Sequence, residues 1–249
     1  MDSLVMNQFI VNQCIQSGVL FLTAYGGGQL VIKKGVRVNY TRKINHFMLF
    51  ISPMLLNRIL SYEYTLVTLI ASFLIGVLTL GVYIKPIREK YGFIATMFAS
   101  FDRPEDRPNT LLWVSTQIIV AGFILIPMIV YFFTIGKLDL VFIPLLINGL
   151  GDGLAEPVGV AFGKHKYTVR ALFSDKRYER SLEGSFCVFV VSVLSIILMV
   201  GNFTHHQFIV ALAVIPVVMT LAEALSPHTW DSPFLFGVCG LALYFILQI

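Results

Sequence analysis

The chain has 249 residues, of which 57% are hydrophobic and 13% are charged, and its mean hydropathy is +0.80. This composition excludes an ordinary soluble globular protein and predicts an all-α, polytopic integral membrane protein. The net charge of +4 indicates anionic partners at a membrane surface and no nucleic acid. No polar stretch is long enough for a soluble domain, so we predict a single transmembrane domain over residues 1–249 with no separate soluble domain.

Eight apolar segments are predicted to be membrane-spanning helices, because about 20 helical residues cross a hydrocarbon layer of about 30 Å. Their continuous apolar character favours helices over the alternating strands of a barrel. The predicted spans are residues 9–32, 44–60, 64–84, 111–135, 139–162, 184–201, 206–225 and 232–249.

Basic residues between these segments predict the orientation of the chain. Of the 18 Lys and Arg residues, all but two lie in the segments 33–43, 85–110 and 163–183. The eight-span topology places these segments on one side of the membrane, and it places Arg58 and Lys137 on the other. By the positive-inside rule the basic side is cytoplasmic, so both termini lie on the opposite side.

The first polar cluster along the chain is the sequence TRKINH, in which Arg42, Lys43 and His46 lie where the second span begins. The cluster is either part of a site or an ordinary basic flank whose long side chains reach head-group phosphates. Farther on, the apolar segment Tyr91–Phe101 either lies at the membrane interface and shapes lipid access or is a plain packed loop.

The second cluster ends the fifth span, in the sequence INGLGDGLAEPVGVAFG, which contains Asp152 and Glu156. A charged residue inside a bilayer costs about 2.5–3.5 kcal/mol on insertion scales, so two carboxylates predict a functional site that faces a wet cavity. Pro157 disfavours a helical conformation at Glu156, so we expect the fifth span to unwind near its cytoplasmic end. The glycines of this segment either free the backbone to approach a ligand or permit close helix packing. They are Gly149, Gly151, Gly153, Gly159 and Gly163.

Two more clusters lie on the same predicted side of the membrane. Glu183 in RSLEGS precedes the sixth span, and Glu223, His228 and Asp231 in EALSPHTWDSP join the last two spans. We expect all four clusters to converge on one pocket at the cytoplasmic interface. Carboxylate oxygens suit Mg²⁺, which takes one or two carboxylates together with waters and phosphate oxygens. With the basic segment 163–183 beside the carboxylates, the sequence predicts a site for a metal-bound polyphosphate.

Standard phosphate-binding and metal motifs do not occur in the sequence. The segment VGVAFGKHK differs from a P-loop, because its first Gly is one residue too close and His165 stands where Ser or Thr would hold Mg²⁺. The three cysteines, Cys14, Cys187 and Cys239, lie in apolar stretches without ligand spacing, so neither a disulfide framework nor zinc is indicated.

The four clusters resemble motifs of the CTP-dependent lipid kinases, which include dolichol kinase, phytol kinase and CTP-dependent diacylglycerol kinase. GDGLAEPVGVAFGKHKY followed by RSLEGS resembles the core of that family, TRKINH its Arg-Lys-x-x-His motif, and EALSPHTWDSP its closing segment. The resemblance implies CTP-dependent phosphorylation of a membrane lipid alcohol of the polyprenol, phytol or diacylglycerol type, with Mg²⁺ as cofactor.

Roles for individual residues follow from this hypothesis. Asp152 and Asp231 hold Mg²⁺, and Glu156 is either a further ligand or the base that takes the lipid hydroxyl proton. These three form the expected catalytic set. The residues expected to bind the nucleotide are Lys43, His46, Lys164, Lys166, Arg180 and Glu183.

Two departures from the family pattern bear on the lipid substrate: Ser232 stands where many members have Asn, and Glu156 where many have Asp. A more distant resemblance to phosphatidate cytidylyltransferases gives an alternative reaction, transfer of CMP to a lipid phosphate. A membrane transporter is the second alternative, but its charged groups would be expected in two matching halves and not on one side.

Overall fold

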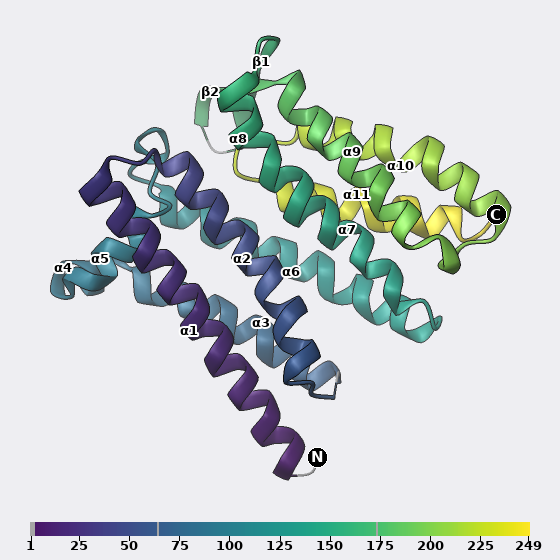
Figure 1. The fold of residues 1–249 in the computed structure, drawn as a ribbon, viewed down its shortest axis with the longest axis horizontal. Helices are drawn as coiled ribbons and strands as arrows, with labels where there is room; N and C mark the ends of the chain where they lie inside the picture. Colours follow the sequence, from purple (N-terminus) through teal and green to yellow (C-terminus); the bar gives the residue numbers. More distant parts are fainter. Residues whose placement is uncertain (1–2, 64, 173) are drawn as a thin grey trace. The chain divides into compact units, whose positions relative to one another are not determined.

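The computed structural model describes residues 3–63, 65–172 and 174–249, and these residues are almost entirely helical (Figure 1). Contacts within the chain divide it into two compact units, unit 1 (Met1–Ser115) and unit 2 (Thr116–Ile249). The boundary falls inside a helix, α6 (Thr110–Thr134). The single transmembrane domain therefore stays a prediction.

Unit 1 consists of helices that pack closely at small residues. Its elements are α1 (Ser3–Lys34), α2 (Val38–Ile59), α3 (Leu66–Leu80), η1 (Gly81–Tyr83), α4 (Lys85–Lys90), α5 (Gly92–Ala99), η2 (Pro104–Asp106) and the start of α6. A Cβ atom on Gly28 of α1 would lie 1.7 Å from the Thr96 carbonyl oxygen of α5, so only glycine permits this approach. Asn12 of α1 donates to Asn57 Oδ1 and to the Leu60 carbonyl, both at 2.9 Å, which links α1 to the end of α2.

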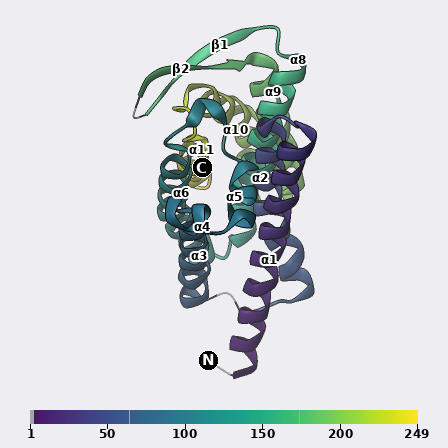
Figure 2. The same ribbon diagram turned by 90° about the vertical axis from the view of Figure 1, so that its left-hand side faces the viewer.

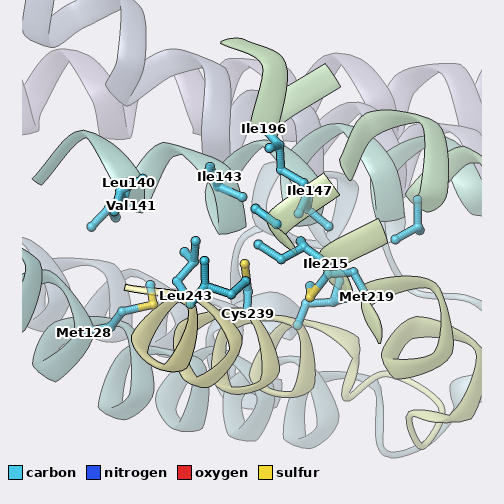
Figure 3. Packing of buried hydrophobic residues seen from close by; sticks show 14 of the residues in the cluster. Met128, Leu140, Val141, Ile143, Ile147, Ile196, Ile215, Met219, Cys239 and Leu243 are labelled. Atoms are coloured by element: carbon cyan, nitrogen blue, oxygen red, sulfur yellow. The ribbon is translucent and has the colours of Figure 1, made fainter. Parts of the chain in front are cut away.

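Unit 2 holds the larger hydrophobic core. After α6 come η3 (Leu138–Val141), α7 (Phe142–Leu146), the π-helical turn η4 (Ile147–Asp152), α8 (Gly153–Phe162), β1 (Lys166–Ala171), β2 (Ser174–Ser181), α9 (Leu182–Leu198), η5 (Val200–Asn202), α10 (His205–Leu225) and α11 (Asp231–Ile246). Figure 3 shows Ile143 and Ile147 beside Ile215 of α10 and Leu243 of α11, and all four are fully buried. This core brings the ends of α8, α9, α10 and α11 together.

The chain is an all-α protein with several apolar helices suited to a membrane. Among the described residues, five helices are long and apolar enough to cross a bilayer. They are Met6–Lys34, Leu66–Tyr83, Thr110–Thr134, Leu138–Phe162 and His205–Leu225. The apolar helices α9 and α11 are shorter, and α2 carries Arg42, Lys43 and His46 in its first half. All eight predicted segments are thus helical, while the number of crossings and the orientation stay predictions.

The sequence did not predict one element, and one local prediction is wrong. In the basic segment 163–183, β1 and β2 form an antiparallel hairpin at the end of unit 2 where α8 ends and α9 begins (Figure 2). The helix also does not unwind at Glu156, since α8 continues through Pro157. The irregularity of the helix lies earlier, in the π-helical turn η4. Pro157 has no backbone N–H to donate, and close packing of α8 on α9 offsets the loss of that hydrogen bond.

Candidate functional site

The guanidinium of Arg180 is the centre of a buried polar cluster in unit 2. Arg180 lies at the end of β2, and its side chain is 12% exposed. It donates to the carbonyl and to the carboxylate of Glu223 at the end of α10, and to Asp231 Oδ1 at the start of α11 at 2.5 Å. It also donates to Ser226 Oγ at 3.2 Å, and Ser226 Oγ donates to Asp231 Oδ1. One side chain from the hairpin therefore joins the two helices on either side of the loop 226–230.

A third carboxylate, that of Asp152, acts electrostatically on the same guanidinium. Asp152 is the last residue of the π-helical turn and is buried. Burial by itself lowers the pKa of Arg180, but the charges of Asp231, Glu223 and Asp152 outweigh it and raise the pKa above its ordinary value. Arg180 therefore stays charged at any physiological pH, and three carboxylates from three elements surround it.

Glu223 has one carboxylate oxygen that accepts no hydrogen bond from the described residues. Its Oε1 accepts from Arg180, whereas its Oε2 is buried and has no hydrogen-bond partner among the described residues. Nearby, the hydroxyls of Tyr167 and Ser185 lie 2.7 Å apart. Burial and then the charge of Glu223 raise the pKa of Tyr167, so its phenol remains protonated at neutral pH. A buried oxygen without a partner is costly, and it is typical of a place where a cation or a donor binds.

The inner face of the hairpin packs on the loop that follows α10. The ring of Tyr178 stacks on that of His228 with 3.5 Å between centroids and 6° between planes. The backbone N–H of His228 donates to the Arg170 carbonyl at 2.9 Å. The next residue, Thr229, has φ 67°, a left-handed conformation that a β-branched residue rarely adopts. The loop that presents Asp231 is therefore held in an unfavourable backbone conformation by its contacts with the hairpin.

A chain of polar side chains leads from this loop into the helices. Gln117 of α6 donates to Ser232 Oγ at 3.0 Å, and Ser232 Oγ donates to Asn148 Oδ1 at 3.2 Å. Asn148 is fully buried and lies in the same π-helical turn as Asp152. These bonds tie α6, α11 and η4 together beside the carboxylates, in a region that is otherwise apolar.

The structure places the other predicted site residues in different surroundings. Lys166 forms an exposed ion pair with Glu179 at 2.9 Å. Glu183 accepts from the backbone N–H of His165 and lies 2.8 Å from its ring Nδ1. Lys164 is exposed and, with Glu183, lines a cavity of about 540 Å³ that also includes Ala161, Phe162 and Gly163. Glu156 is half-buried on α8.

Lys43 and His46 belong to unit 1, so their convergence with the carboxylates stays a prediction. Both lie near the start of α2. Lys43 is buried, with 3% of its surface exposed, and the ring of His46 lies 5.0 Å from that of Phe50. A buried lysine is unlike the snorkelling basic flank that we weighed as one alternative for this cluster.

The glycines around Asp152 serve close packing. A Cβ atom on Gly151 would lie 3.2 Å from Val188 Cα of α9, and one on Gly159 would lie 2.9 Å from Ser181 Oγ. On the other side of this contact, a Cβ atom on Gly184 would lie 2.5 Å from the Ala155 carbonyl. Gly151 thus lies at a close helix contact and Gly159 at a close contact with the end of β2, while approach of a ligand to these glycines stays a prediction.

Sequence reasoning missed several members of the cluster. Tyr167, Ser226, Gln117 and Asn148 received no role, although Gln117 and Asn148 are polar residues inside apolar segments, which is a signal that could have found them. Arg180 was expected to contact phosphate, and in the structure it binds carboxylates. The face of the hairpin on which Arg180 lies could have been predicted from the alternation of Tyr178 with charged residues.

The carboxylates of this cluster are hard oxygen ligands of the kind that Mg²⁺ prefers. Among the described residues, no group of three or more His, Cys, Asp or Glu side chains could hold a metal ion. Mg²⁺ takes only one or two carboxylates and keeps waters and phosphate oxygens, so two carboxylates with a buried unused oxygen nearby agree with it. A structural zinc site would need four closed ligands and does not fit.

Comparisons with known proteins give no family for this chain. No protein-family model, curated protein or solved structure matches it. The motifs set out above and the geometry of unit 2 are therefore what bears on function.

Proposed function

We propose that the chain is a CTP-dependent lipid kinase that phosphorylates a membrane lipid alcohol of the polyprenol, phytol or diacylglycerol type. The observation that carries the proposal is the buried cluster of Asp152, Glu223 and Asp231 around Arg180 at one end of a bundle of apolar helices. Buried carboxylates are costly in such a protein, so they favour a site over a packing contact. The resemblance of the four sequence clusters to lipid-kinase motifs is what suggests CTP and Mg²⁺ as the ligands of this site.

In this proposal Asp152 and Asp231 would hold Mg²⁺, which would neutralise charge on the triphosphate. Arg180 keeps Asp231 in place through a direct hydrogen bond, so its part is to position a carboxylate. The lipid hydroxyl oxygen attacks the γ-phosphorus, the bond to the β–γ bridging oxygen breaks, and CDP leaves. The hydroxyl proton goes to a carboxylate, for which Glu156 is the candidate.

The remaining predicted residues bind the nucleotide. Lys164 is exposed beside its cavity and is available to a phosphate, and Glu183 lines the same cavity. Lys166 would have to leave Glu179 to reach a phosphate. Lys43 and His46 are assigned to nucleotide binding by the sequence motif alone. The topology that serves this reaction has eight spans, with the site on the cytoplasmic face and both termini on the opposite side.

The test is product analysis with purified protein, Mg²⁺, labelled CTP or ATP, and phytol, dolichol, diacylglycerol or phosphatidate. A lipid kinase gives CDP and a lipid phosphate. A cytidylyltransferase, which could use the same carboxylates, gives pyrophosphate and a CDP-lipid. If no nucleotide turns over with any lipid, both enzyme proposals fail, and solute uptake into liposomes then tests the transporter.

A further inference from the structure

The outer face of the hairpin carries a pair of arginines that the carboxylate cluster does not use. In the register of β1 and β2, Arg170 lies directly opposite Arg177. Side chains alternate between the two faces of a strand, so this pair lies on the face opposite to Val169, Tyr178 and Arg180. Burial agrees, because Arg170 and Arg177 are exposed and Val169 and Tyr178 are buried. The pair is therefore separate from the site around Asp231.

Like charges directly opposite each other destabilise a β-hairpin. Directly opposed residues have Cβ atoms about 4.5–5.5 Å apart, so the two guanidinium groups repel each other. Neither side chain makes an ion pair or a hydrogen bond with any described residue. Asp175 lies two residues before Arg177 on the same face, but it forms no ion pair with either arginine among the described residues. The repulsion is thus not compensated within the part of the chain that the structure describes.

Two other basic residues of the hairpin have acidic partners. Lys166 pairs with Glu179 on the same outer face, and Arg180 pairs with Glu223 and Asp231 on the inner face. In the same hairpin, two arginines lie directly opposite each other, although directly opposed positions favour opposite charges. Such exceptions are expected at functional positions.

The backbone of the hairpin has contacts with the loop 226–230 at this point. The Arg170 carbonyl accepts from the His228 backbone N–H at 2.9 Å, and Tyr178, the neighbour of Arg177, stacks on the His228 ring. A β-bulge between Arg170 and Ala171 increases the local twist and directs the side chains. The two arginines therefore lie opposite each other on a backbone that has contacts with the loop 226–230.

We propose that Arg170 and Arg177 form a binding site for a phosphate group. The planar guanidinium donates two parallel hydrogen bonds to phosphate, and two such groups facing one anion would replace their mutual repulsion with charge-assisted hydrogen bonds. The phosphate belongs either to a soluble polyphosphate, such as that of a nucleotide, or to a lipid head group. The site does not depend on phosphoryl transfer at Asp152 and Asp231, because it lies on the other face of the hairpin.

The test measures binding of two probes to the purified full chain in detergent, inorganic triphosphate and a short-chain phosphatidate. Arg170→Gln and Arg177→Gln are each expected to weaken at least one probe about tenfold, the effect of losing a charged hydrogen-bonding group. The probe that binds tells which source of phosphate the site takes. Arg37→Gln, which removes an exposed arginine far along the chain from the hairpin, is the control and is expected to change binding less than twofold.

A second variant separates binding from folding. Arg177→Glu replaces the repulsion with a cross-strand attraction, so we expect the Tm to rise by about 2 °C while binding of the same probe is lost. The proposal is overturned if neither probe binds the unaltered protein, if both hairpin variants bind as well as it does, or if Arg37→Gln weakens binding equally. None of these results depends on CTP turnover, so failure of the kinase proposal and failure of this site are distinguishable.

Discussion

At the scale of single residues, Arg180 determines how the candidate site is held. Its guanidinium binds the end of α10 and the start of α11, and Asp152 adds a third negative charge nearby. A buried ion pair adds little net stability to a protein, but removing one partner leaves the other charge buried and unpaired, which is strongly destabilising.

We therefore expect Arg180→Met to destabilise the protein by about 3 kcal/mol, the usual cost of breaking a buried pair. The measurement is thermal unfolding in detergent, where the Tm should fall by roughly 6–12 °C. Lys166→Met is the matched control, because it removes a cation of the same hairpin from an exposed pair. Such a pair is worth about 0–1 kcal/mol, so this variant should unfold close to the unaltered protein. Equal shifts for the two variants would contradict the buried cluster.

Glu223 gives a second prediction at this scale. Glu223→Gln keeps an acceptor for Arg180 and removes the negative charge that raises the pKa of Tyr167. The phenol should then titrate at lower pH, which ultraviolet absorbance of phenolate measures against a Tyr167→Phe reference. The sign follows from the cause, since a nearby negative charge disfavours the phenolate and its loss favours it. A Tyr167 titration that does not move would contradict the proximity of these groups.

At the scale of elements, glycines set how closely the helices approach. Gly28 of α1 faces the Thr96 carbonyl of α5, and Gly184 of α9 faces the Ala155 carbonyl of α8. In both places a methyl group would meet backbone, which cannot move aside as a side chain can.

Gly28→Ala is expected to destabilise unit 1 by about 1–3 kcal/mol, because the added Cβ would lie 1.7 Å from Thr96 O. Gly18→Ala lies in the same helix, has nothing within 4 Å of the added Cβ, and should be neutral or stabilising by up to about 1 kcal/mol. Thermal unfolding of the two variants side by side measures the difference. If Gly28→Ala is as stable as Gly18→Ala, α1 and α5 do not pack at this glycine.

The elements also show what the sequence could and could not predict. All eight apolar segments are helical close to their predicted bounds, because a long apolar run leaves few alternatives. The hairpin was missed, since the charges of its outer face obscure the alternation of Tyr167, Val169 and Ala171. The prediction from Pro157 was wrong because close packing between α8 and α9 outweighs the preference of the residue before a proline for a non-helical conformation.

The sequence predicted the carboxylates of the candidate site but not the contacts that hold them. Asp152 and Asp231 could be found because carboxylates are conspicuous in apolar sequence, and both are buried beside Arg180. The partners of Arg180 could not be found, since they depend on which face of the hairpin meets α10 and α11. That choice is made by tertiary packing of Tyr178 on His228.

At the scale of the whole molecule, the account depends on how the chain crosses the membrane. The eight-span topology places residues 34 and 176 on the cytoplasmic side, residue 61 on the opposite side, and residue 201 at the end of its span on that opposite side. Lys34, Lys176, Ser61 and Gly201 are exposed, so each can be replaced by cysteine in a background without Cys14, Cys187 and Cys239.

An impermeant thiol reagent applied to intact cells should then label Ser61→Cys and Gly201→Cys, and it should label Lys34→Cys and Lys176→Cys only after the membrane is opened. The physical reason is the excess of Lys and Arg on the cytoplasmic side. Labelling of Lys34→Cys and Lys176→Cys from opposite sides would contradict the topology, and with it a single cytoplasmic site.

The central claim is phosphoryl transfer from CTP to a lipid alcohol at the carboxylate cluster. The most direct measurement follows label from γ-labelled CTP into lipid, with the unaltered protein and with Asp152→Asn, whose fold is checked by thermal unfolding. We predict a labelled lipid phosphate with the unaltered protein and at least a hundredfold less with the variant, in the range of a lost charge-stabilising group. Label released as pyrophosphate, no transfer to any lipid, or equal transfer by a folded Asp152→Asn protein would contradict the claim.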